Sequence, residues 1–132
     1  MRVKCVVDTN VLISAALSKG APFRILEHLI KNNALIFSKE TISELSSRIT
    51  QSKFDKYVSA EDREAYVNNL ILSADLVIID NLIQGCRDRD DDKFLETAVK
   101  GDARFIISGD QDLLTMHRFE GIDIVTVQEF AV

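Results

Sequence analysis

The stretch VKCVVDTNVLISAAL, residues 3–17, places one aspartate between two different hydrophobic patterns. The first part, Val3 to Val7, is a short valine-rich run of the kind that forms a buried strand, and it ends at Asp8. From Thr9 to Leu17 the apolar residues instead recur at helical spacing, at Val11, Leu12, Ala15 and Ala16. This stretch therefore predicts a buried strand, an acidic junction and a helix that covers the strand.

The same alternation of short apolar strands and longer amphipathic helices continues along the chain. We expect further strands at residues 35–37, 76–79, 105–107 and 122–126. We expect helices from about Pro22, from about Lys39, from a capping Ser59 to about Ala74, from Asp91 or Asp92, and through Leu113 and Leu114. Strands that alternate with helices form parallel sheets covered on both faces. The fold class is therefore α/β: a three-layer α/β/α sandwich with a parallel, Rossmann-like sheet of about five strands, formed by residues 1–132 as one domain.

Composition and charge exclude several classes of protein. The 132 residues are 46% hydrophobic and 28% charged, as in ordinary globular domains. With 16 basic against 21 acidic residues and a net charge of −5, the chain is not expected to coat nucleic acid by bulk electrostatic attraction. Cys5 and Cys86 have no metal-ligand spacing, and no apolar run approaches the roughly 20 residues of a membrane span. We therefore expect a reduced, cytoplasmic protein with no membrane segment.

Acidic residues follow the predicted strands at one edge of the sheet. Asp8 ends the first strand, Asp110 and Asp112 follow the fourth, and the acidic run 88–92 leads into the helix between the third and fourth strands. Ligands of open parallel sheets bind outside the carboxyl ends of the strands, so these acids are expected to converge. Hard oxygen ligands of this kind suit Mg²⁺ or Mn²⁺.

Each of these acids also has a purely structural interpretation. Asp8 is as well suited to capping a helix as to holding a metal, and Asp91 or Asp92 can cap the next helix. Asp110 and Asp112 fit a turn after Gly109. Glu44 alone is more typical of a solvent-facing helix position. The coincidence of all of them at one edge of one sheet favours a functional cluster.

At this point the chain resembles the PIN domain family, metal-dependent nucleases that include many bacterial and archaeal toxins. The resemblance rests on four motifs in order along the chain: 6–12 (VVDTNVL), 43–45 (SEL), 91–98 (DDKFLETA) and 107–114 (ISGDQDLL). The phrase RDRDDDKFL at residues 87–95 is similar to a subfamily regarded mainly as toxin components of toxin–antitoxin modules. The resemblance implies a PIN-like fold over the whole chain.

The resemblance also implies a site. Its members would be the acidic cluster Asp8, Glu44, Asp91 and Asp110, with Asp112 close by. Asp91 is preferred to Asp92 because it stands seven residues before Ala98, although the run of three aspartates leaves a one-residue ambiguity. Thr9 or Ser108 would supply a hydroxyl, and Asn10 would brace the loop.

From these implications we expect an endoribonuclease that hydrolyses phosphodiester bonds with Mg²⁺ or Mn²⁺. Asp8, Asp91 and Asp110 would hold the ion, and Glu44 and Asp112 would complete a second site or orient the attacking water. The resemblance implies single-stranded or structured RNA as substrate, a cognate antitoxin protein as partner, and a possible homodimer. Candidate phosphate contacts are the basic residues Arg48, Arg87, Arg89 and Arg104.

Two other interpretations stay open. The chain can be a catalytically weak PIN-fold binding or scaffold module that retains cation binding. A receiver-like signalling domain would use Asp80, after the third strand, as its phosphoacceptor, but it lacks a suitable lysine after the fourth or fifth strand.

Overall fold

The central sheet follows directly from the short apolar runs. The computed structural model describes residues 3–86 and 88–131. Within them the strands β1 (Cys5–Val7), β4 (Phe105–Ile107) and β6 (Ile122–Val125) pair in parallel, and β5 (Arg118–Phe119) pairs antiparallel with β6. The order across this sheet is β1-β4-β6-β5.

The expected strand count was wrong, because the predicted strands do not all join one sheet. The central sheet has four strands, while β2 (Ile36–Ser38) and β3 (Asp75–Val77) form a separate parallel pair. A single bridge between Cys5 and Leu35 links this pair to β1. The fourth strand of the central sheet is β5, which the sequence patterns did not predict. It exists because Glu120 and Gly121, both with positive φ, turn the chain back onto β6.

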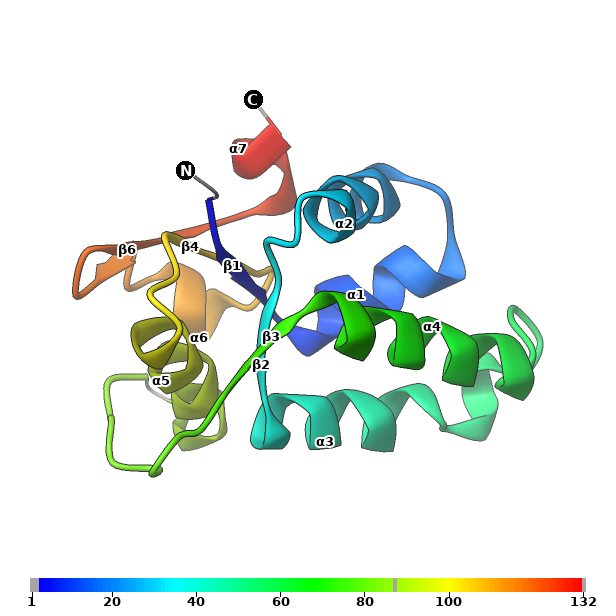
Figure 1. Ribbon diagram of the computed structural model, residues 1–132, viewed down its shortest axis with the longest axis horizontal. Helices are drawn as coiled ribbons and strands as arrows, with labels where there is room; N and C mark the ends of the chain where they lie inside the picture. The colour runs from blue at the N-terminus through cyan, green and yellow to red at the C-terminus, as the bar shows by residue number, and fades with distance from the viewer. Residues whose placement is uncertain (1–2, 87, 132) are drawn as a thin grey trace.

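Helices cover both faces, which confirms the three-layer arrangement (Figure 1). Their bounds are α1 (Thr9–Leu17), α2 (Ala21–Lys31), α3 (Lys39–Ile49), α4 (Ala60–Ser73), α5 (Asp92–Lys100), α6 (Gln111–Leu114) and α7 (Val127–Ala131). Two short 3₁₀ turns, Ser52–Phe54 and Arg89–Asp91, complete the elements.

The two cores are separated by the alternation of side chains along β1. Cys5 and Val7 pack with residues of α1, α2, α3, α4 and α7, whereas Val6 packs with residues of α5 and α6. Successive side chains of a strand point to opposite faces of its sheet, so this three-residue strand serves both cores. β1 therefore fixes the position of Asp8, the next residue, between the two helical layers.

Side-chain caps begin several of the helices. The Ser59 oxygen accepts the N–H of Asp62 at 3.1 Å, as expected from the sequence, and Ser38 accepts that of Thr41. Asp8 and Asp110 cap α1 and α6 in the same way. Such caps satisfy N–H groups that have no partner inside the helix.

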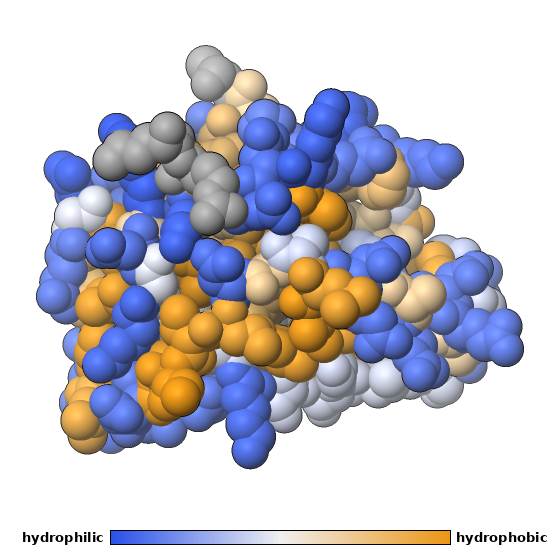
Figure 2. Space-filling model, viewed as in Figure 1, coloured by the Kyte–Doolittle hydropathy of each residue, from blue (hydrophilic) through white to orange (hydrophobic). Residues whose placement is uncertain are grey.

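One face of the molecule carries apolar side chains over β3 and the segment that follows it (Figure 2). The large exposed hydrophobic residues in this region are Leu72, Leu76, Ile78 and Leu82. No helix in the described part of the chain is long and apolar enough to cross a membrane.

Candidate active site

A small acidic pocket lies where the carboxyl ends of β1 and β4 meet α3 and the start of α5. Its volume is about 80 Å³, and six of its ten lining residues are acids. We call it the carboxylate pocket; it is lined by Asp8, Thr9, Asn10, Glu44, Arg48, Asp88, Asp90, Asp91, Phe94 and Asp110. Acids from four distant parts of the chain are thus brought together at one edge of the sheet.

Asp8 is both a helix cap and a wall of this pocket. Its side chain is 4% exposed. One carboxylate oxygen accepts the N–H of Val11 at 3.1 Å, and the other accepts the hydroxyl of Ser108. Burial raises the pKa of Asp8, although the bonds from Ser108 and Val11 oppose that rise. The capping and metal-site interpretations of Asp8 therefore do not exclude each other.

Ser108 ties Asp8 to the next acid of the pocket. Its oxygen, which donates to Asp8, also accepts the backbone N–H of Asp110 at 2.9 Å. The Asp110 carboxylate in turn accepts the N–H of Asp112 at 2.8 Å, which begins α6. The turn after β4 is therefore fixed by Ser108 together with Asp110, which lines the pocket.

Asp91 has a buried oxygen that no neighbour satisfies. Among the described residues, Asp91 Oδ2 is the one buried side-chain oxygen or nitrogen without a hydrogen-bond partner. Burial raises the pKa of Asp91, and repulsion from Asp110, Asp88 and Asp8 raises it further, to about 7. An unpaired buried polar atom costs free energy, so this oxygen points to a missing positive partner.

A set of three acids offers oxygens close enough to share one ion. Asp88, Asp91 and Asp112 each supply an oxygen within 4.8 Å of the others. Carboxylate oxygens are the ligands that Mg²⁺ and Mn²⁺ prefer. The residues present therefore fit a divalent cation, both by the chemistry of the donors and by the unpaired oxygen of Asp91.

Glu44 differs from the other acids because it is already paired. Its Oε1 lies 2.8 Å from the ammonium of Lys93 and 3.4 Å from the guanidinium of Arg48. Its Oε2 accepts the hydroxyl of Thr9. Glu44 thus links α1, α3 and α5 and holds two cations beside the carboxylate pocket.

Asp92 points away from the carboxylate pocket. Its carboxylate accepts the backbone N–H groups of Gly85 and Cys86 at 3.1 and 2.9 Å. Of the three consecutive aspartates at 90–92, the structure thus aims Asp91 at Asp110 and uses Asp92 to hold the loop that follows β3.

Glu96 anchors the same loop. It is 1% exposed, and its carboxylate accepts four consecutive backbone N–H groups, from Asp80, Asn81, Leu82 and Ile83. Burial raises the pKa of Glu96, but these four bonds outweigh it, so that the pKa lies below its ordinary value. Asp80, the phosphoacceptor of the receiver-like interpretation, is thereby tied to α5 and pairs with Lys100 at 3.6 Å.

Only some of the basic residues that were expected near the site lie there. Arg48 lines the carboxylate pocket, and Arg89 lines a neighbouring cavity. Arg104 was wrongly expected there: it directly precedes β4, at the opposite edge of the sheet, where its N–H donates to the carbonyl of Lys4. Arg87 lies outside the described residues.

Two contributors, Lys93 and Glu96, were missed from the sequence, and Asp88 was expected near the site only as part of the acidic run 88–92. Asp88 and Lys93 stand inside an unbroken run of charged residues, 87–93, where spacing does not separate a ligand from a solvated charge. The available signal for Glu96 was its helical spacing, because it stands four residues after Asp92 and directly after the apolar Leu95. In the structure these three residues are buried on α5.

Comparison with known proteins identifies the family. A family model described as PIN domain matches residues 4–112. The uncharacterized protein MJ1680 of Methanocaldococcus jannaschii is 32% identical over 119 residues, which cover 88% of this chain and 76% of that protein.

Two solved structures share the fold. PAE2754 from Pyrobaculum aerophilum matches with a TM-score of 0.64 and 14% identity, over 97% of this chain and 86% of that chain. VapBC2 from Rickettsia felis, bound to a DNA fragment from their promoter, matches with a TM-score of 0.61 and 15% identity, over 94% and 98%. The family model spans all four motifs of the resemblance except the last two residues of the fourth. On this evidence the chain belongs to the PIN domain family.

Proposed function

We propose that this chain is a metal-dependent nuclease that hydrolyses RNA phosphodiester bonds at the carboxylate pocket. The observation that carries the proposal is the buried, unpaired Oδ2 of Asp91, set among carboxylates that raise the pKa of Asp91 to about 7. Membership of a family whose members are generally nucleases supports it. We further propose that residues 1–132 act as one PIN domain.

In this proposal Asp8, Asp91 and Asp110 hold Mg²⁺ or Mn²⁺. A bound divalent cation would supply a water of lowered pKa and positive charge against the phosphate oxygens. Asp88 and Asp112 each offer an oxygen near Asp91 and would extend the set of donors. Asp91 takes the metal position in preference to Asp92, because the carboxylate of Asp92 is engaged by the loop.

The remaining polar residues hold these acids in place. Ser108 donates to Asp8, which fixes the direction of that carboxylate and favours its charged form. Thr9 donates to Glu44, so the second acid of the motif set is also fixed in orientation. Asn10 is exposed at the rim, where its amide can contact the sugar–phosphate chain.

We propose that this chain is the toxin of a toxin–antitoxin pair. In this role it would bind a cognate antitoxin protein and form a homodimer. Support comes from the fold shared with VapBC2 of Rickettsia felis. The exposed apolar residues near β3 supply surface for such contacts, since large apolar patches on a protein mark interaction sites.

Cleavage of an end-labelled single-stranded RNA tests the proposal. Wild type with Mn²⁺ or Mg²⁺ should cut the RNA, and EDTA or Asp8→Asn should abolish cutting. Asp62→Asn, an exposed acid of α4, is the matched control and should cut like wild type. If wild type and Asp8→Asn are equally inert, a cation-binding scaffold replaces the nuclease. If both cut equally, the carboxylate pocket is not the site.

A further inference from the structure

A hollow lined by uncharged residues lies at the carboxyl ends of β1, β4 and β6. Its volume is about 380 Å³, within the size range of small-ligand pockets. It is bounded by α1 and Pro22, by the turn after β4 together with α6, and by residues 126–128, which follow β6. We call it the neutral hollow, because every described residue that lines it is uncharged.

The sheet topology makes this edge the expected place for a ligand. β1 and β4 are neighbours, yet the helices that follow them pack on opposite faces of the sheet. Val11 and Leu12 of α1 join one core, and Leu113 of α6 joins the other. A crevice opens outside the carboxyl ends of two such strands, and open parallel sheets bind their ligands there. The neutral hollow belongs to this crevice, because residues that follow both strands line it.

The neutral hollow lies next to the carboxylate pocket. Asn10 lines both, and Ser108, which lines the hollow, donates to Asp8 of the pocket. In the turn after β4, Gly109 lines the hollow and the next residue, Asp110, lines the pocket. A ligand held at the carboxylate pocket can therefore place a neighbouring group in the hollow.

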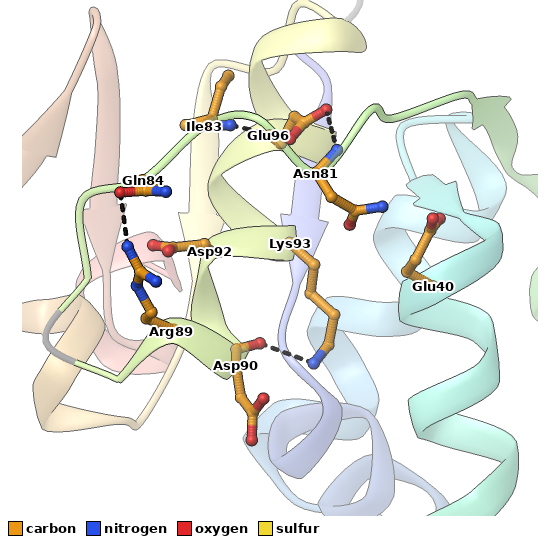
Figure 3. A pocket seen from close by; sticks show the side chains of 9 residues that line it. All are labelled: Glu40, Asn81, Ile83, Gln84, Arg89, Asp90, Asp92, Lys93 and Glu96. Carbon is orange, nitrogen blue, oxygen red and sulfur yellow. Dashed lines mark hydrogen bonds between the residues drawn. The ribbon is translucent and has the colours of Figure 1, made fainter.

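The cavity between α3, the loop after β3 and α5 is a poorer place for nucleic acid (Figure 3). Four carboxylates and two cations line it: Glu40, Asp90, Asp92, Glu96, Arg89 and Lys93. Its excess of negative charge repels phosphate groups, whereas the neutral hollow presents no such charge. Of the two, the neutral hollow is therefore the one that suits a neutral part of an RNA chain.

Burial divides the lining of the neutral hollow into an apolar interior and a polar mouth. Val11 and Val127 are buried, and Pro22 and Leu114 are half-buried. Exposed amide side chains stand at the mouth, among them Gln111 and Gln128. An apolar interior suits the flat face of a nucleobase, and amides, which both donate and accept, suit its edge.

We propose that the neutral hollow binds a nucleobase of the RNA, the base of a nucleotide next to the scissile phosphate. The apolar interior contacts the face of the base, and the amides of Gln111 and Gln128 contact its edge. Neither amide has a hydrogen-bond partner within the described part of the chain, so both are available to a ligand. The position beside a scissile phosphate rests on the proposed function, whereas binding of a base rests on the hollow.

A titration with nucleosides tests this proposal without metal. Adenosine, cytidine, guanosine and uridine, which carry no phosphate, are added separately to the ¹⁵N-labelled full chain in EDTA while amide shifts are recorded. We expect at least one nucleoside to bind, with its largest shifts at Gly109, Gln111 and Gln128. Ribose alone, which lacks a base, should cause no such shifts.

Two variants and a control complete the experiment. Gln128→Ala should weaken nucleoside binding about fivefold, the size of one neutral hydrogen bond. Gly109→Leu should prevent binding because it adds bulk to the lining; no heavy atom lies within 4 Å of the place its Cβ would take, so the fold tolerates it. Gln51→Ala, at an exposed glutamine outside the hollow, should bind like wild type.

The outcomes separate the base site from the nuclease. Absence of shifts at the hollow, equal shifts from ribose and the nucleosides, or wild-type affinity in either Gln128→Ala or Gly109→Leu overturns the base site. If the nucleosides bind as expected but wild type does not cut RNA, the base site stands and the nuclease fails.

Discussion

Asp110 lies against Asp91, and its negative charge adds to burial in raising the pKa of Asp91 to about 7. The ordinary value for an aspartate is about 4. The fold thus holds one carboxylate where its charged form is unfavourable near neutral pH unless a cation is present. Because of this relationship, metal binding and stability are each expected to depend on pH, and metal binding is expected to affect stability.

Stability without metal is expected to fall as the pH rises. A carboxyl whose pKa is raised in the folded state stabilises the fold fully below its unfolded pKa, near 4, and that contribution is lost as the pH rises through about 7. Urea unfolding in EDTA should therefore give a lower free energy of unfolding at pH 8 than at pH 5. Asp91→Asn should lessen this difference and raise stability at pH 8. An unchanged profile in Asp91→Asn would contradict the assignment.

Ser108 is expected to affect metal affinity more than stability. Ser108→Ala removes the hydrogen bond that favours the charged form of Asp8. Loss of such a supporting contact lowers metal affinity by about tenfold or more. Calorimetric titration with Mn²⁺ measures this change, and Ser47→Ala, an exposed serine of α3, is the control. Equal Mn²⁺ affinity in Ser108→Ala and wild type would contradict the supporting role of Ser108.

Glu96 is expected to be needed for the loop after β3. Glu96→Ala leaves four backbone N–H groups without their acceptor, which should lower the free energy of unfolding by about 2–4 kcal/mol. Hydrogen exchange at residues 81–83 should accelerate more than exchange in β1. The exposed Glu64→Ala on α4 serves as control. Unchanged exchange in the loop would refute the anchoring role.

Arg63 is expected to matter for stability alone. It is buried, donates to the carbonyls of Ile49 and Gln51 at 2.6 and 3.1 Å, and pairs with Asp55. Arg63→Ala should lower the free energy of unfolding by about 3–5 kcal/mol, because it leaves these partners without their hydrogen-bond donor. Mn²⁺ affinity measured below the melting temperature should stay at the wild-type value, since Arg63 does not line the carboxylate pocket. A matching loss of affinity would contradict that separation.

The sequence predicted the parts of this molecule that depend on local periodicity. The strand before Asp8, the cap at Ser59 and the position of Asp110 after β4 all come from patterns within a few residues. Strand order and sheet membership could not be predicted from such local patterns, because the break between β1 and the pair β2–β3 depends on contacts between distant segments. β5 has only two residues, too few for a pattern.

In the candidate site, too, local patterns could be predicted from the sequence and contacts between distant segments could not. The order of the acidic motifs could be recognised, and the place of Asp8 at the end of a strand followed from the apolar run before it. The pairing of Glu44 with Lys93 could not, because it joins helices 49 residues apart in sequence. The role of Glu96 was hidden for a similar reason: its partners are backbone N–H groups, which every residue of that loop presents equally.

The central claim is that a divalent cation binds among Asp8, Asp91 and Asp110, and direct Mn²⁺ titration at pH 8, by calorimetry or electron paramagnetic resonance, tests it most directly. The account predicts saturable binding to wild type, a loss of at least about tenfold in affinity in Asp91→Asn, and wild-type affinity in the exposed-acid control Asp62→Asn. Equal Mn²⁺ binding by wild type and Asp91→Asn, or no binding by wild type, would contradict it.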